Sequence, residues 1–253
     1  YRDAGAGGGG AGGALRLTAT RPPPVVDLTQ KMPPIFDQGS IGSCTAHASL
    51  AVYTAIAIAR DDVDHDVPQS RLAQYYNTRL IEGTTSWDAG ASMRSAMTAL
   101  NKYGTGDERL WPYIESKIFT KPSTAYYTNA KLHKITYLRV TTSVSSFKTC
   151  LAAGSPITLG ITCFDEIMSD HAATTGFVGM PANPAITLGG HAIVFVGYDD
   201  TRVDPAVPTV KGYFKFRNSW GSRWGDPASP GYGYLPYAYI QYCFDSWKIA
   251  TIT

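Results

Sequence analysis

The sequence is poor in cysteine and in charge, and it has no long apolar run. Its 253 residues include four cysteines, with 22 Lys and Arg against 20 Asp and Glu. The net charge is +2 and the sequence has no basic stretch that could bind a phosphate backbone, so we expect no nucleic-acid partner. The longest nearly apolar stretch, residues 46–59, contains polar side chains and is shorter than the ~20 residues that span a bilayer, so we expect no membrane segment.

The composition is that of a chain with a substantial core. Hydrophobic residues make up 44% and aromatic residues 12% of the sequence, which excludes a disordered, collagen-like or disulfide-dense small protein. A chain of this length buries roughly 70–75% of its unfolded surface, either in one large domain or in two lobes around a shared cleft.

Residues 1–34 are typical of a tail, because Gly7–Gly13 is almost all glycine and Pro22–Pro24 favours an extended path. We expect this tail to pack on the body of its own chain. The sequence starts at Tyr1 without a basic segment followed by an apolar one, so we expect that any secretion signal has been removed or is not part of this sequence.

The rest of the sequence divides into a mainly helical part, residues 35–130, and a mainly β part, residues 131–253. Apolar spacing and flanking Gly and Pro predict helices over residues 44–60, 68–83, 92–104 and 144–153. Short β-branched or aromatic segments predict strands over residues 135–140, 156–161, 191–198, 212–217 and 247–252. The fold class is therefore α+β, with a ligand site expected in a cleft between the two lobes.

Three local motifs contain residues with catalytic potential. In Asp37–Cys44, a glycine-punctuated loop delivers Cys44 to a helix start, where the helix dipole favours a thiolate; a small buried cysteine is an equally good interpretation. In Gly189–Val194, His191 opens a strand and could serve as a general base or make a structural hydrogen bond. In Arg217–Gly221, the Asn218 amide could fix the imidazole tautomer while Trp220 excludes water, although such a segment alone is more often a turn.

Taken together, in the order Gln38, Cys44, His191 and Asn218, these motifs resemble those of the papain-like cysteine peptidases. The resemblance extends from about Val26 onward. The separation of Cys44 and His191 lies within the ~130–150 residues typical of that family, whereas the separation of Cys44 and Asn218 is longer. We place the excess in a polar loop over residues 199–211.

The resemblance implies a papain-like two-lobed fold, in which an antiparallel, β-barrel-like lobe faces the helical lobe across the active site. It implies a thiolate–imidazolium pair of Cys44 and His191 that forms a thioester with a polypeptide substrate. Gln38 and the Cys44 backbone N–H would hold the oxyanion. No cofactor is needed.

The same resemblance suggests how substrate is bound. Peptide would lie along the backbone of Gly90 and Ala91, beside Trp220. Met93 and Ala192 match positions of the main specificity pocket, which suggests an apolar residue two positions before the cut.

This sequence departs from the family at the loop before the nucleophile. Ile41 and Thr45 stand where family members usually have cysteine and tryptophan, so the usual disulfide cannot form and packing of Ile41 must replace it. The disulfide-poor pattern is similar to that of the bacterial and viral branch of the family. We expect the other cysteines, Cys150, Cys163 and Cys243, to be reduced and buried.

No metal site is expected. Cys44 and His47 alone have a short ligand spacing, and His47 is more simply a packed residue. His65 lies in the acidic run Asp61–Asp66, which is most simply a solvated loop and less readily a calcium site.

The leading hypothesis is therefore an active cysteine endopeptidase, monomeric and secreted or exposed at the cell envelope. The N-terminal tail would be a short prosegment that can occupy the cleft. One alternative is a catalytically silent homologue that binds peptides. Another is acyl transfer to an amine, as in transglutaminase-like chemistry.

Overall fold

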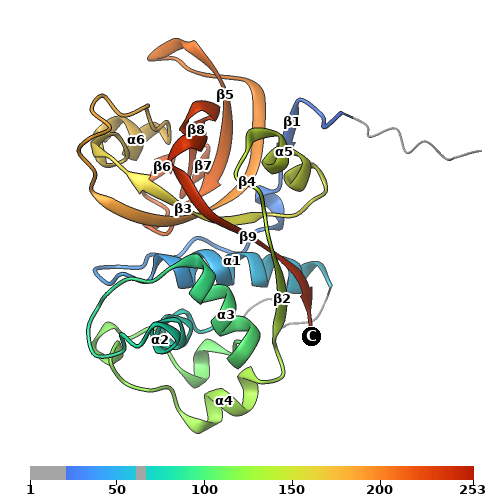
Figure 1. Ribbon diagram of the computed structural model, residues 1–253, viewed down its shortest axis with the longest axis vertical. Coiled ribbons are helices and arrows are strands. Elements are labelled where there is room, and N and C mark those ends of the chain that lie inside the picture. Colours follow the sequence, from blue (N-terminus) through green and yellow to red (C-terminus); the bar gives the residue numbers. More distant parts are fainter. Residues whose placement is uncertain (1–20, 61–66) are drawn as a thin grey trace, which may run out of the picture.

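The computed structural model describes residues 21–60 and 67–253, and Figure 1 shows a helical half below a β half. The helical half contains α1 (Cys44–Ala59), α2 (Arg71–Glu82), α3 (Met93–Tyr103) and α4 (Thr124–Ala130). Two further helices, α5 (Val144–Ala152) and α6 (Asp170–Thr175), lie beside the sheet. Short 3-10 turns cover Thr29–Lys31, Glu108–Leu110, Glu115–Lys117, Asp165–Met168 and Tyr237–Tyr242.

The β half is built on one antiparallel sheet with the strand order β2-β9-β3-β4-β5-β8, and β1 pairs with β4. Its strands are β1 (Val25–Asp27), β2 (Ile135–Arg139), β3 (Ile157–Cys163), β4 (Gly189–Asp204), β5 (Val207–Arg217), β8 (Tyr232–Pro236) and β9 (Cys243–Ile252). A small hairpin joins β6 (Gly225–Asp226) to β7 (Ser229–Pro230). The α+β class is confirmed.

Along the described residues, the sheet is antiparallel as predicted but does not close into a barrel. Within residues 21–60 and 67–253, the end strands β2 and β8 do not pair with each other. The reason is visible in Figure 1, where β2 and the end of β9 run down alongside the helical half. Contacts of α3 with both strands anchor them there, so this edge of the sheet does not curve back towards β8.

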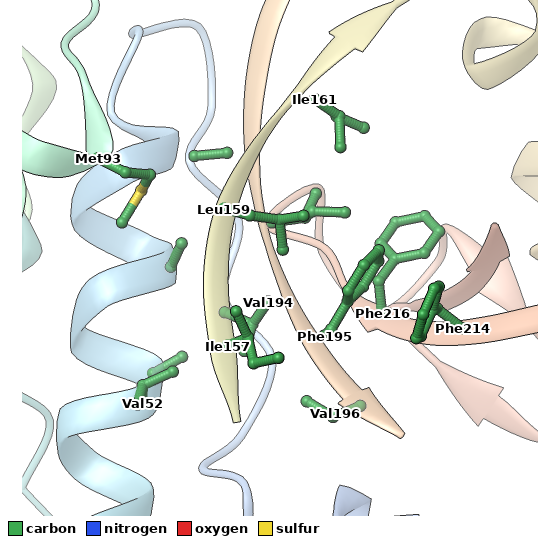
Figure 2. Close-up of a cluster of buried hydrophobic side chains, with 14 of the residues drawn as sticks. Val52, Met93, Ile157, Leu159, Ile161, Val194, Phe195, Val196, Phe214 and Phe216 are labelled. Atoms are coloured by element: carbon green, nitrogen blue, oxygen red, sulfur yellow. The ribbon is translucent and has the colours of Figure 1, made fainter. Parts of the chain in front are cut away.

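Helix α1 is central because it is apolar all round, as its sequence predicts. Twelve of its residues are buried, and it packs against α2 and α3 on one side and against β3 and β4 on the other. Figure 2 shows the second contact, where Val52 lies near Ile157 and Val194. A buried helix between the two halves gives Cys44, its first residue, a fixed position between them.

The prediction of a loop over residues 199–211 is wrong. Strands β4 and β5 continue through it as a hairpin, with Asp204 paired with Val207. Much of the hairpin is exposed, so its polar residues and proline are compatible with strand structure. The extra length relative to the family therefore extends the sheet.

The described part of the tail belongs to the β half. β1 pairs with residues 197–199 of β4, and Leu28 is buried in the main core. None of residues 21–34 lines the cleft described below. Residues 1–20, on which the prediction of a cleft-covering tail mainly rests, lie outside the described residues.

Candidate active site

Cys44 lies at the first turn of α1, at the boundary of the two halves. Its sulfur is approached by the backbone N–H groups of Cys44, Thr45 and Ala192, the last of which follows His191 on β4. Burial raises the pKa of the Cys44 thiol, and these three N–H groups oppose that shift. The site therefore offers hydrogen bonds to a thiolate but little solvent.

His191 is held by Asn218 on the far side of its ring. The Nε2–Oδ1 distance is 2.8 Å, and both side chains are buried. The same Asn218 oxygen accepts the Ser219 backbone N–H at 2.8 Å, which fixes the direction of the amide. With Nε2 donating to Asn218, the Nδ1 of His191 is left as the basic nitrogen.

Trp220 covers the imidazole. Its ring stacks on that of His191 with a centroid distance of 4.8 Å and an interplanar angle of 28°. Burial lowers the pKa of His191 to about 4, and the hydrogen bond to Asn218 opposes the shift. Burial therefore favours the neutral forms of both Cys44 and His191, and an ion pair between them depends on the attraction of the two charges for each other.

Both the nitrogen and the oxygen of the Gln38 side-chain amide are hydrogen-bonded. Its Nε2 donates to the carbonyl of Ile41 at 3.0 Å, and its Oε1 accepts the Ser219 hydroxyl at 2.6 Å. Its backbone is also held, because Gln38 N–H donates to Ser219 O at 2.9 Å. One of the two amide hydrogens on Nε2 is left for a ligand.

A cleft of ≈ 800 Å³ brings together nearly all the residues predicted for the site. Those that line it are Gln38, Cys44, Gly90, Ala91, Met93, His191, Ala192 and Trp220. Asn218 lies behind His191 and lines a separate cavity of ≈ 310 Å³ between the two halves. The sequence motifs thus meet at one place.

The cleft also has walls that no sequence motif indicated. They include Gly160, Cys163, Met168, Leu188 and Phe244. Gly160 and Cys163 lie on β3 and Phe244 on β9, whereas Met168 ends the 3-10 turn Asp165–Met168 and Leu188 directly precedes β4. From the sequence, Cys163 is expected only to be reduced and buried.

The loop before Cys44 is joined to the backbone around Gly90 without a disulfide. Ile41 is buried and packs with Leu72 and Ile118, as its sequence position predicts. Asp88 adds a polar clip, because its carboxylate accepts the Gly42 backbone N–H at 3.0 Å and the hydroxyl of Tyr75.

The Tyr75 hydroxyl completes this clip by accepting the Gly90 backbone N–H at 3.0 Å. The clip therefore joins the loop before Cys44 to the backbone of Gly90. The four cysteines are all free thiols, and Cys150, Cys163 and Cys243 are buried as expected.

The part of the chain that the structure describes contains no group of three or more side chains suited to hold a metal ion. The calcium alternative for His65 falls in residues 61–66, which lie outside the described residues. Across the described ranges, no helix combines the length and apolar character needed to cross a membrane.

Comparison with known proteins agrees with this geometry. The sequence model of the papain family cysteine proteases matches residues 22–243. A peptidase C1-like protein of Acanthamoeba polyphaga mimivirus is 33% identical over an alignment of 261 positions, which covers 94% of this chain and 79% of that protein. The chain therefore belongs to the papain family of cysteine proteases.

Among solved structures, the chain is similar to xylellain, a cysteine protease from Xylella fastidiosa. The two are 35% identical with a TM-score of 0.80, over 91% of this chain and 87% of xylellain. Bromelain from Ananas comosus shares the fold at 21% identity and a TM-score of 0.63, over 90% of this chain and 98% of that one. The predicted family is confirmed, and both the viral relative and xylellain agree with the predicted branch.

Proposed function

We propose that this papain-family protease is an endopeptidase in which Cys44 is the nucleophile, His191 the general base and acid, and Asn218 the residue that orients the imidazole. The observation that carries the proposal is the 2.8 Å hydrogen bond from His191 to Asn218 at the cleft that contains Cys44. Because this bond uses Nε2, Nδ1 is available for the thiol proton.

The reaction begins when the proton of Cys44 moves to His191 and the sulfur attacks a peptide carbonyl. The Gln38 amide and the Cys44 backbone N–H receive the developing oxyanion, at roughly 3–4 kcal/mol for each donor. His191 then protonates the leaving amine, and water hydrolyses the thioester. The N–H groups that approach the sulfur support the thiolate at the start of this sequence.

Substrate lies extended along Gly90 and Ala91, where small side chains leave the backbone accessible. Met93 and Ala192 line the same cleft and favour an apolar residue two positions before the scissile bond. We also infer that the N-terminal tail restrains this activity.

The decisive test compares Cys44→Ala with Cys150→Ala, a buried thiol outside the cleft. Cys44→Ala should fold but cleave neither an unfolded protein nor short fluorogenic peptides, whereas Cys150→Ala should retain activity. Cleavage by Cys44→Ala refutes the proposal.

Deletion of residues 1–20 should raise the rate of peptide cleavage. A chain that is inactive after that deletion, and whose Cys44 is not alkylated, would favour the silent homologue. Product diverted by added amines would favour acyl transfer.

The pH dependence of alkylation by iodoacetamide tests the ion pair. A thiolate–imidazolium pair gives fast alkylation of Cys44 from about pH 5 upward. If burial alone governs the thiol, alkylation instead accelerates only above its ordinary pKa of 9.0. The His191→Ala variant serves as the reference for a thiol without its partner.

A further inference from the structure

The backbone of β9 is irregular next to the cleft. Asp245 has a φ of 49° and is the one non-glycine residue with a positive φ in the described ranges. The register with β3 shifts at this point, since Thr158 pairs with Trp247 but Gly160 pairs with Phe244. β9 therefore has one extra residue here, which is a β-bulge. Bulges and left-handed residues cost free energy and are often found at functional sites, where they redirect a side chain.

One result of the bulge is the position of Phe244. The ring lies against Gly160, because a Cβ added there would be 2.4 Å from Cε2 of Phe244. It also reaches Gly190, where a Cβ would be 3.5 Å from Cζ. Phe244 is 46% exposed although it is a large apolar residue, and it lines the cleft.

The other result is that Asp245 reaches the helical half. Its Oδ2 accepts the backbone N–H of Arg94 at 2.9 Å, in the first turn of α3, and its Oδ1 accepts Trp247 Nε1–H at 2.6 Å. A carboxylate at a helix N-terminus is favoured by the free N–H groups and by the helix dipole. The residue before Arg94 is Met93, which is 2% exposed and lines the same cleft.

We infer that Asp245 is a positioning residue for substrate selection. Its carboxylate fixes the start of α3, and its bulge fixes Phe244, so one residue sets the separation between Met93 and Phe244. These two side chains come from different halves of the molecule, and their separation limits the size of the apolar substrate side chain held between them. The inference rests on the proposed function, since it assigns these residues to the subsite for the residue two positions before the cut.

The test is Asp245→Asn, matched by Asp226→Asn. Asparagine tolerates a left-handed backbone, but its single amide oxygen can serve only one of the two donors that the carboxylate binds. Asp226 likewise accepts a backbone N–H, from Ala228, and a side-chain donor, the Tyr234 hydroxyl, but it lies outside the cleft. The substrates are matched fluorogenic peptides with Leu or Ala two positions before the cut.

For Asp245→Asn, the ratio of kcat/KM for the Leu peptide to that for the Ala peptide should fall about tenfold, mainly through KM. Alkylation of Cys44 by iodoacetamide should stay within about twofold of the original chain, and Asp226→Asn should change neither quantity. In a Phe244→Ala background, Asp245→Asn should no longer affect the ratio. A parallel loss for both peptides, with the ratio unchanged, would show a merely structural role and overturn the inference.

Binding measurements separate this inference from the proposed function. The dissociation constants of the two peptides are measured on Cys44→Ala, with and without Asp245→Asn. If no variant cleaves peptide, the proposed function fails, but the ratio of the two dissociation constants still tests the role of Asp245. If Asp245→Asn leaves that ratio unchanged, the inference about Asp245 is overturned. Should Asp245→Asn not fold, Asp245→Gly keeps the left-handed backbone and removes the carboxylate that binds the Arg94 N–H, and an unchanged ratio in that variant overturns the inference.

Discussion

The polar clip beside Cys44 can be tested by Tyr75→Phe. The Tyr75 ring is fully buried beside Ile41 and Leu72, and phenylalanine keeps this packing. The substitution removes only the hydroxyl, which donates to Asp88 and accepts the Gly90 backbone N–H at 3.0 Å.

The expected loss of stability follows from those two hydrogen bonds. A bond to a charged acceptor contributes roughly 1.5–3 kcal/mol and a neutral bond roughly 0.5–1.5 kcal/mol, so the free energy of unfolding should fall by about 2–4.5 kcal/mol. For a chain of this length, that corresponds to a decrease in Tm of roughly 5–15 °C. We also expect kcat/KM for peptides to fall, because Gly90, which we propose to bind substrate, loses the hydrogen bond that fixes its backbone.

Calorimetry and urea denaturation measure the first effect and peptide hydrolysis the second. The matched control is Tyr198→Phe, which removes a single hydrogen bond of 2.7 Å to Pro23 O, away from the cleft. It should cost about 1 kcal/mol and leave hydrolysis unchanged. If Tyr75→Phe is no less stable than Tyr198→Phe, the clip does not hold the loop.

Three further predictions concern single residues. Asn218→Ala should lower kcat about 100-fold, because His191 Nε2 loses its partner, and an unchanged kcat would remove Asn218 from the mechanism. Burial lowers the pKa of His47 to about 3, so the stability it contributes is complete above its ordinary pKa of 6.5 and is lost as the pH falls towards 3. His47→Gln should therefore reduce the pH dependence of unfolding between pH 6 and 4 by about 1.4 kcal/mol per pH unit in urea titrations, and an unaltered slope would contradict this. Gly104→Ala should cost about 3 kcal/mol in thermal unfolding, since the added Cβ would lie 1.9 Å from Ala130 O. Gly83→Ala places its Cβ where no atom lies within 4 Å, so it should cost only the ~1–2 kcal/mol of a left-handed backbone. Equal costs for the two substitutions would refute the steric argument.

Much of the helical half could be predicted from local sequence. α1 is apolar on every face, and Gly83 and Gly104 end α2 and α3 with the positive φ that glycine readily adopts. The helix–loop motif around Cys44 was recognisable for the same reason, because the cysteine and the glycines that deliver it are neighbours in sequence.

The missed features depend on contacts between distant segments. Phe244 enters the cleft through a bulge in β9, and the clip of Asp88 requires Tyr75 on another element. The hairpin over residues 199–211 was mistaken for a loop, because its exposed strands tolerate polar residues and proline. Strand register and hydrogen bonds between distant side chains are set only when the sheet and helices have folded, so no local sequence pattern predicts them.

The replacement of a disulfide by the Asp88 clip has a chemical consequence. A protease that works through a cysteine needs that sulfur reduced, and reducing agents that protect it would break a stabilising disulfide in the same molecule. Here the loop that presents Cys44 is held by carboxylate, hydroxyl and amide groups, none of which responds to thiols. Thiols that keep Cys44 reduced therefore leave this support intact, and we expect the free energy of unfolding to be the same with and without an added thiol reductant.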